Sequence, residues 1–161
     1  MANLQRKRLL LVKGSFVPFG GGERDLINNL EAWSEYFDLS VATLHPNKEL
    51  IEKLKDLKIP LFSPVSNWSY SRGILSEIFA RSSRNASKKW YSMLSLTNQG
   101  VGLSTLFSNI DAVNITTGMA SLEILPYIPG DIPIHTYMHE PNRGLHSNDL
   151  HFDVDGTPKQ N

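Results

Sequence analysis

The sequence predicts an α/β protein: a single Rossmann-like domain with a mainly parallel sheet and helices on both faces. Short apolar runs alternate with segments that have the period of a helix, which is typical of βαβ units with right-handed crossovers. The first run, at residues 9–12, is apolar at every position, as expected for a strand that is buried on both faces. We therefore expect about five strands, with residues 9–12 at the centre of the sheet.

Each apolar or periodic segment predicts one element. Residues 23–37 are predicted to form a helix, because apolar side chains recur there at steps of three and four positions. Asn47 can cap the next helix, and Pro60 favours an edge position for the strand that contains it. The predicted strands are residues 9–12, 39–44, 59–62, 111–116 and 132–138. The predicted helices are residues 23–37, 48–57, 74–80, 88–110 and 120–128. Gly100 and Gly102 weaken the prediction of a helix at residues 88–110.

Length and composition narrow the class of protein. A chain of 161 residues predicts one domain with one core, and a formal net charge of zero implies no general attraction to nucleic acid. There are no cysteines, which excludes disulfides, thiolate zinc sites and cysteine nucleophiles. We see neither a signal peptide nor a membrane span. We therefore expect a cytoplasmic protein that needs neither a metal nor an organic cofactor.

The first candidate site is the glycine-rich turn between the first strand and the first helix. Gly20, Gly21 and Gly22 let the backbone approach a ligand closely, and the following helix offers unpaired N–H groups to an anion. Together these features favour a phosphate. Glu23 lies in the first turn of the helix, where it can act as a cap. The turn matches neither G-x-G-x-x-G nor a P-loop, and the alternative interpretation is a flexible turn beside a well-placed acid.

The second candidate site is His139, which follows the last predicted strand. An imidazole has a pKa near neutrality and can act as a general base, and the neighbouring Glu140 could adjust that pKa. Ligands of an open parallel sheet bind at the carboxyl ends of its strands, where the glycine turn and His139 would share one cleft. An ordinary surface or core histidine is the alternative, and His135 on the same strand is a competing candidate.

A third feature is a basic, aromatic segment between residues 68 and 91. Its basic side chains predict contact with an anionic membrane surface, at which the interleaved aromatic rings would lie. An equally good interpretation of the same residues is a solvated helix whose aromatic residues join the core. The basic residues are Arg72, Arg81, Arg84, Lys88 and Lys89, with Glu77 as the single acid.

These residues resemble the N-terminal half of a GT-B glycosyltransferase of the GT4 type. The resemblance covers residues 7–145 and rests on the first strand, the Pro18-x-Gly20-Gly21-x-Glu23 turn and the His139-Glu140-Pro141 segment. It implies retaining transfer of a sugar from a nucleotide sugar to an acceptor. By position, the glycine turn would lie near the donor diphosphate and His139 near the reacting sugar, and Arg143 would contact an acidic acceptor. Peripheral membrane contact on the cytoplasmic face is also implied.

The resemblance is partial, and this affects the expected activity. Members of that family continue into a second, nucleotide-binding domain, which has no counterpart here. We therefore expect residues 1–145 to form the acceptor-side domain, residues 146–161 to form a polar tail, and activity to require a C-terminal nucleotide-binding half. The chain is then a truncated copy, a fragment, or one of two separately encoded halves. Two other classes stay open: a stand-alone phosphate- or nucleotide-binding module, and a non-catalytic docking partner.

Overall fold

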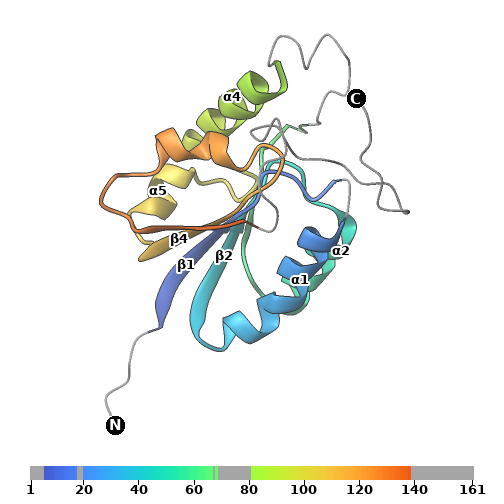
Figure 1. Ribbon diagram of the computed structural model, residues 1–161. Coiled ribbons are helices and arrows are strands. Elements are labelled where there is room, and N and C mark those ends of the chain that lie inside the picture. Colours follow the sequence, from blue (N-terminus) through green and yellow to red (C-terminus); the bar gives the residue numbers. More distant parts are fainter. Residues whose placement is uncertain (1–5, 18–19, 67, 69–80, 139–161) are drawn as a thin grey trace, which may run out of the picture.

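The fold is an open sheet of five parallel strands (Figure 1). The computed structural model describes residues 6–17, 20–66, 68 and 81–138. The strand order is β3-β2-β1-β4-β5, so β1 lies in the middle, which confirms both the predicted fold class and the central position of residues 9–12. The strands are β1 (Lys7–Val12), β2 (Phe37–Ala42), β3 (Leu61–Phe62), β4 (Ala112–Thr116) and β5 (Ile134–Tyr137).

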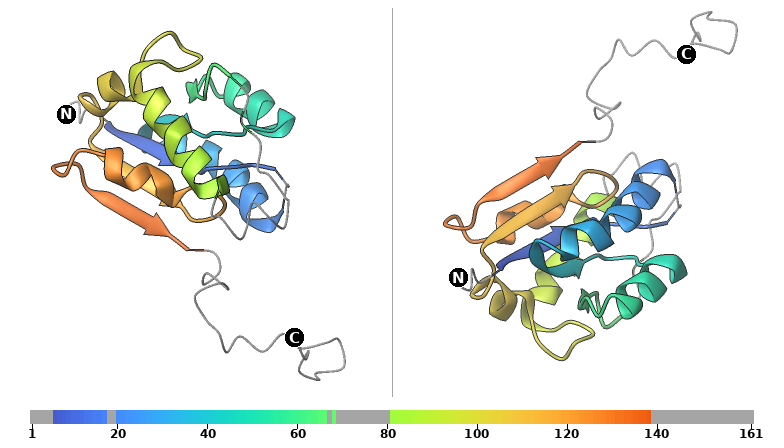
Figure 2. Two further views of the ribbon diagram at one scale, coloured as in Figure 1. Left: turned by 90° about the horizontal axis from the view of Figure 1, so that it is seen from above. Right: turned by 90° about the horizontal axis from the view of Figure 1, so that it is seen from below.

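Helices cover both faces of the sheet (Figure 2). One face carries α1 (Gly21–Ser34) and α2 (Lys48–Asp56), and the other carries α4 (Arg81–Ser95), α5 (Leu103–Phe107) and the 3₁₀ helix η1 (Leu122–Tyr127). β1 supplies side chains to both hydrophobic clusters: Leu10 packs under α4 and Leu11 packs under α1. This two-sided burial is the physical reason for the unbroken apolar run.

The helix predicted at residues 88–110 is wrong. α4 ends at Ser95, a loop follows, and α5 begins after its N-cap Gly102. A Cβ at Gly102 would lie 2.0 Å from the carbonyl oxygen of Leu94, so the loop folds back tightly onto the end of α4. The helix expected at residues 74–80 lies outside the described residues.

Smaller differences have local causes. The segment predicted as a helix at residues 120–128 forms the 3₁₀ helix η1, which contains Pro126, a residue that cannot donate a backbone hydrogen bond. β3 lies at one edge of the sheet, as the preceding Pro60 predicted. The predicted boundaries of the other elements are close to those observed.

Half of one sheet face has no helix over it in the described part of the chain. Asn114 of β4 is paired in register with Leu11 and bonded to His135 of β5, so both polar side chains lie on the α1 side of the sheet. The view from below in Figure 2 shows α1 and α2 over β1 to β3, and β4 and β5 uncovered. β4 accordingly carries the polar Asn114 between Val113 and Ile115, whereas β1 is apolar at the paired position Leu11.

Candidate functional site at the carboxyl edge of the sheet

The candidate site lies where the strand order reverses. The chain passes from β1 to β2 and β3 on one side, and returns to β4 on the other side of β1. The carboxyl ends of β1 and β4 therefore lie side by side, and this is the place where open α/β sheets bind ligands. Residues 13–16 after β1, residues 117–121 after β4 and the N-terminus of α1 meet there.

Gly14 ties the two strand ends together. A Cβ at this position would lie 2.2 Å from the carbonyl oxygen of Met119, so only glycine fits. The Gly14 N–H donates to Ser121 Oγ at 2.9 Å, and its carbonyl accepts from the Leu44 N–H at 3.0 Å. The backbone at the edge is thereby held by contacts to both neighbouring strands.

Lys13 and Glu23 form a buried ion pair beside this glycine. The Lys13 side chain is 3 % exposed, and its Nζ lies 2.9 Å from Glu23 Oε1. Nζ also donates to the Thr117 carbonyl at 3.4 Å. A Cβ at Gly118 would approach Nζ to 2.8 Å, so the absence of a side chain there makes room for the lysine.

Glu23 also satisfies the N-terminus of α1. Its Oε2 accepts from the Gly20 N–H at 2.9 Å. Burial acts to raise the pKa of the carboxyl, but the hydrogen bond and charge of Lys13 and the N–H groups of Glu23 and Gly20 outweigh it. The pKa of Glu23 therefore lies below its ordinary value, and the carboxylate supplies an internal anion at the helix N-terminus.

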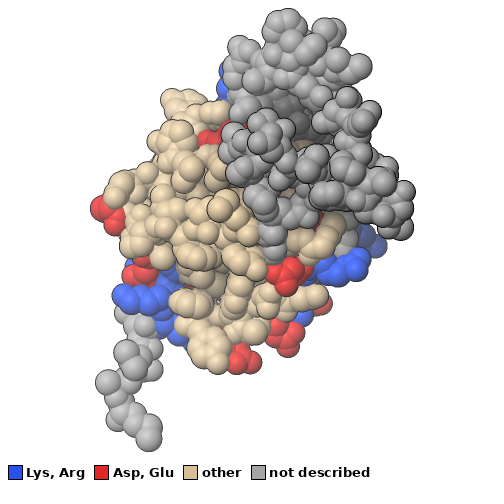
Figure 3. Space-filling model, viewed as in Figure 1, with Lys and Arg blue, Asp and Glu red and all other residues tan. Residues whose placement is uncertain are grey.

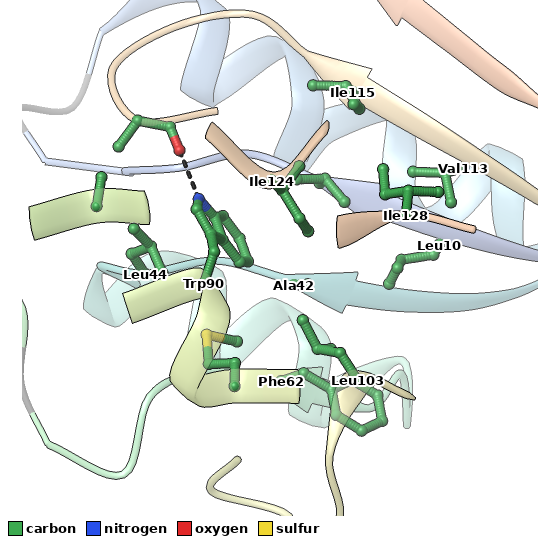
Figure 4. Close-up of a cluster of buried hydrophobic side chains, with 14 of the residues drawn as sticks. Leu10, Ala42, Leu44, Phe62, Trp90, Leu103, Val113, Ile115, Ile124 and Ile128 are labelled. Atoms are coloured by element: carbon green, nitrogen blue, oxygen red, sulfur yellow. Dashed lines mark hydrogen bonds between the residues drawn. The ribbon is translucent and has the colours of Figure 1, made fainter. Parts of the chain in front are cut away.

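The loop after β4 holds one strained residue. Ala120 has a φ of +60°, which costs a non-glycine residue about 1–2 kcal/mol. The fully buried indole of Trp90 donates from Nε1 to the Ala120 carbonyl at 2.8 Å, shown as the dashed line in Figure 4. Trp90 comes from the middle of α4, so a core side chain fixes the conformation of the edge loop.

The predicted glycine turn lies at this edge. α1 begins at Gly21, earlier than expected, so Gly21 and Gly22 form its first turn and Gly20 is the N-cap. Gly21 is exposed, and a Cβ there would meet no atom within 4 Å. Packing within the described chain therefore does not explain this glycine.

The second predicted site is only partly covered by the structure. β5 runs to the carboxyl edge, and Met138, the last residue described there, is exposed. His139, Glu140 and Arg143 lie outside the described residues. The competing candidate His135 lies on the sheet face, where its Nδ1 is 2.9 Å from Asn114 Nδ2.

The basic segment divides into parts with different surroundings. Arg72 lies outside the described residues; Arg81 and Arg84 lie in the first turn of α4, and their side chains are not described. Lys88 is exposed, whereas Lys89 donates to the carbonyl and to the hydroxyl of Ser66. Of the aromatic residues, Trp68 and Trp90 are buried in the core and Tyr91 is exposed.

Sequence reasoning missed Lys13 and His45. A lysine directly after a fully apolar strand is a recognisable signal, because such a position is buried and a buried charge needs a partner. His45 follows β2, and its ring packs edge-on against Trp68 at 6.3 Å. Its Nδ1 is buried and has no hydrogen-bond partner among the described residues. No pattern in the sequence marks His45.

Other features of the described residues do not add to this site. A pocket of about 360 Å³ lies at the opposite edge, between α5 and the segments that lead into β4 and β5, where Asp111 and Asp131 are among the lining residues. Within the described ranges there is no cluster of three metal-ligating side chains. None of the described helices is long and apolar enough to cross a membrane.

Comparisons with protein-family models, curated proteins and solved structures found no match for this chain.

Proposed function

We propose that this chain is the acceptor-side half of a retaining glycosyltransferase that uses a nucleotide sugar. The observation that carries the proposal is the meeting of β1, β4 and the N-terminus of α1 at one carboxyl edge, in a sheet of order β3-β2-β1-β4-β5. This edge is where a doubly wound sheet binds its ligand. The resemblance of the glycine turn and of the His139 segment to the GT4 type supplies the class of reaction.

The glycine turn is assigned to the donor diphosphate. Gly21 is exposed and has open space around its Cα, so the backbone N–H groups of the first turn can be approached closely. The carboxylate of Glu23 balances the charge of Lys13 and accepts from the Gly20 N–H, so the N–H groups of Gly21 and Gly22, and not a free lysine, would hold the phosphate. An alanine methyl at Gly21 would occupy the space that the phosphate needs.

His139 is assigned to the reacting sugar. It follows Met138, where the chain has reached the carboxyl edge. In this role the imidazole holds a hydroxyl or accepts its proton, with Glu140 adjusting the pKa of the ring. Arg143 is assigned to an acidic group of the acceptor.

The test is reconstitution of sugar transfer. We expect the purified chain to transfer no labelled sugar from UDP-glucose or GDP-mannose, and a mixture with a matching C-terminal half to do so. His139→Ala should lower the rate of the mixture by about 10²–10⁴-fold. Gly21→Ala should weaken donor use and leave folding unchanged. Gly130→Ala is the matched control, because a Cβ there also meets no atom within 4 Å.

A stand-alone phosphate-binding module is the second candidate, favoured by the open space around Gly21 at the N-terminus of α1. It predicts that the isolated chain binds UDP in calorimetry and that Gly21→Ala abolishes this binding. Robust binding of UDP by the chain alone, with no gain of transfer from any C-terminal half, would replace the first candidate with the second. Transfer by the chain alone would contradict both.

A further inference from the structure

The strand β5 forms an exposed edge of the sheet. It is the last strand on its side of β1 among the described residues, and all four of its residues are exposed. Ile134 is 41 % exposed, and Met138, which directly follows the strand, is 66 % exposed. An edge with exposed apolar side chains is a template for pairing with another strand.

Hydrogen bonds to β4 show which backbone groups of β5 point outward. The Val113 N–H donates to the Pro133 carbonyl and the Thr117 N–H to the Tyr137 carbonyl, each at 2.9 Å. In a parallel ladder the inward-facing groups belong to alternate residues, here the odd-numbered ones. The N–H and C=O groups of Ile134, Thr136 and Met138 therefore face away from the sheet.

The other edge of the sheet is protected in three ways. β3 has only two residues and is preceded by Pro60. Its outward groups are capped by side chains: Gln99 Nε2 donates to the Leu61 carbonyl at 2.8 Å, and Asn98 Oδ1 accepts from the Ser63 N–H at 2.7 Å. Short edges, prolines and covering loops are the usual devices against edge pairing.

β5 lacks the charges that would protect it. Residues 132–138 contain no Lys, Arg, Asp or Glu. In Figure 3 the charged side chains lie mainly around the rim of the face that shows β5 and η1, and the middle of that face is uncharged. Two copies of this edge can therefore meet without like-charge repulsion.

We propose that β5 pairs antiparallel with β5 of a second copy of this chain, in a register centred on Thr136. The two-fold axis of this pair is normal to the sheet. Residues that lie opposite each other across the interface then have side chains on the same side of the sheet. Even-numbered residues are therefore paired with even-numbered ones. Thr136 then lies opposite Thr136 of the other copy, Ile134 opposite Met138, and His135 opposite Tyr137. The outward-facing residues form hydrogen-bonded pairs, each of which exchanges two N–H···O=C bonds.

The side chains suit this register. Ile134 and Met138 are an apolar pair on one face, His135 and Tyr137 are an aromatic pair on the other, and a Thr–Thr pair lies on the axis. The interface is small, so the dimer is weak, with an expected Kd of about 10–500 μM. It joins two five-stranded sheets edge to edge.

The test uses sedimentation equilibrium of the full chain. We expect the wild type to dimerise, and Thr136→Lys and Thr136→Glu each to be monomeric, because identical charges would face each other across the axis. An equimolar mixture of the two variants should dimerise again, and high salt should weaken that dimer. Thr105→Lys adds the same charge at an exposed position on α5 and should dimerise like the wild type.

Hydrogen exchange of the Thr136 amide distinguishes pairing with a second copy from coverage of this edge by other residues of the same chain. The proposal requires protection that increases with protein concentration. Protection at every concentration in a monomeric chain would mean that other residues of the same chain cover the edge, and would overturn the proposal. A wild type that stays monomeric up to about 1 mM with an unprotected amide, or variants that dimerise like the wild type, would also overturn it.

Discussion

At the scale of single residues, Glu23 connects the helix to the sheet. One carboxylate oxygen pairs with Lys13 at the end of β1, and the other accepts from Gly20 at the start of α1. Because the lysine is 3 % exposed, removing only its partner leaves a charge with little access to water. Such a loss costs about 3–5 kcal/mol.

We predict that Glu23→Gln lowers the free energy of unfolding by about 3–5 kcal/mol, measured by urea denaturation at neutral pH. The double variant Lys13→Met/Glu23→Gln should recover most of this loss, since it removes both charges. Equal destabilisation by the single and the double variant would show that packing, and not charge, sets the effect.

The same pair predicts a dependence on pH. The pKa of Glu23 is lower in the folded chain than its ordinary value of 4.5, so its contribution to stability is complete above pH 4.5 and is lost as the pH falls through the folded pKa. The difference in unfolding free energy between the wild type and Glu23→Gln should therefore shrink as the pH is lowered below 4.5. A difference that stays constant throughout an acid titration of the folded chain would contradict the assignment.

At the scale of secondary-structure elements, α4 has two distinct stripes. Ala86, Trp90 and Met93 are buried against the sheet. Positions 81, 84, 88, 91 and 95 recur at helical steps on the opposite side, and Lys88 and Tyr91 on that stripe are exposed. Of the two lysines of α4, Lys88 therefore lies away from the core, whereas Lys89 is bonded to Ser66.

We predict that the chain sediments with anionic vesicles at low salt and is released at high salt, because each basic residue near such a surface contributes about 1 kcal/mol. Lys88→Glu should weaken binding by about tenfold or more. Lys89→Glu is the matched comparison and should have a smaller effect. Equal binding to neutral and anionic vesicles, or equal effects of the two substitutions, would leave α4 an ordinary solvated helix.

At the scale of the whole molecule, β1 connects two hydrophobic clusters. Leu10 and Leu11 are both buried, yet they point to opposite faces of the sheet and pack under different helices. A strand shared in this way couples the packing of the two layers. The domain should therefore unfold as one unit.

We predict that Leu10→Ala and Leu11→Ala each lower the free energy of unfolding by about 2–5 kcal/mol. Unfolding should follow one transition by far-UV circular dichroism and by tryptophan fluorescence, which reports Trp68 and Trp90 on one face and Trp33 on the other. Separate transitions for the two probes would show that the layers are independent.

The sequence alone determined the fold class and the order of the five strands along the chain. The apolar run of β1, the amphipathic pattern of α1 and the Asn47 cap are local signals, and each produced the predicted element. Pro60 correctly indicated an edge strand. The glycine turn was correctly predicted to join the first strand to the first helix, because both flanking patterns are strong.

Only the tertiary structure decided which distant groups meet at the carboxyl edge. Gly14 lies against Met119, and Trp90 holds Ala120, although each pair is far apart in the chain. The break between α4 and α5 was in part signalled by the sequence, because it includes Gly100 and Gly102, but the close packing of Gly102 against Leu94 was not. Hydrophobic period and turn residues report the local backbone, whereas these contacts depend on strand order, which no local pattern encodes. Burial makes these contacts specific, because a buried charge or backbone carbonyl without a partner costs free energy. The tertiary structure determines which group is close enough to be that partner.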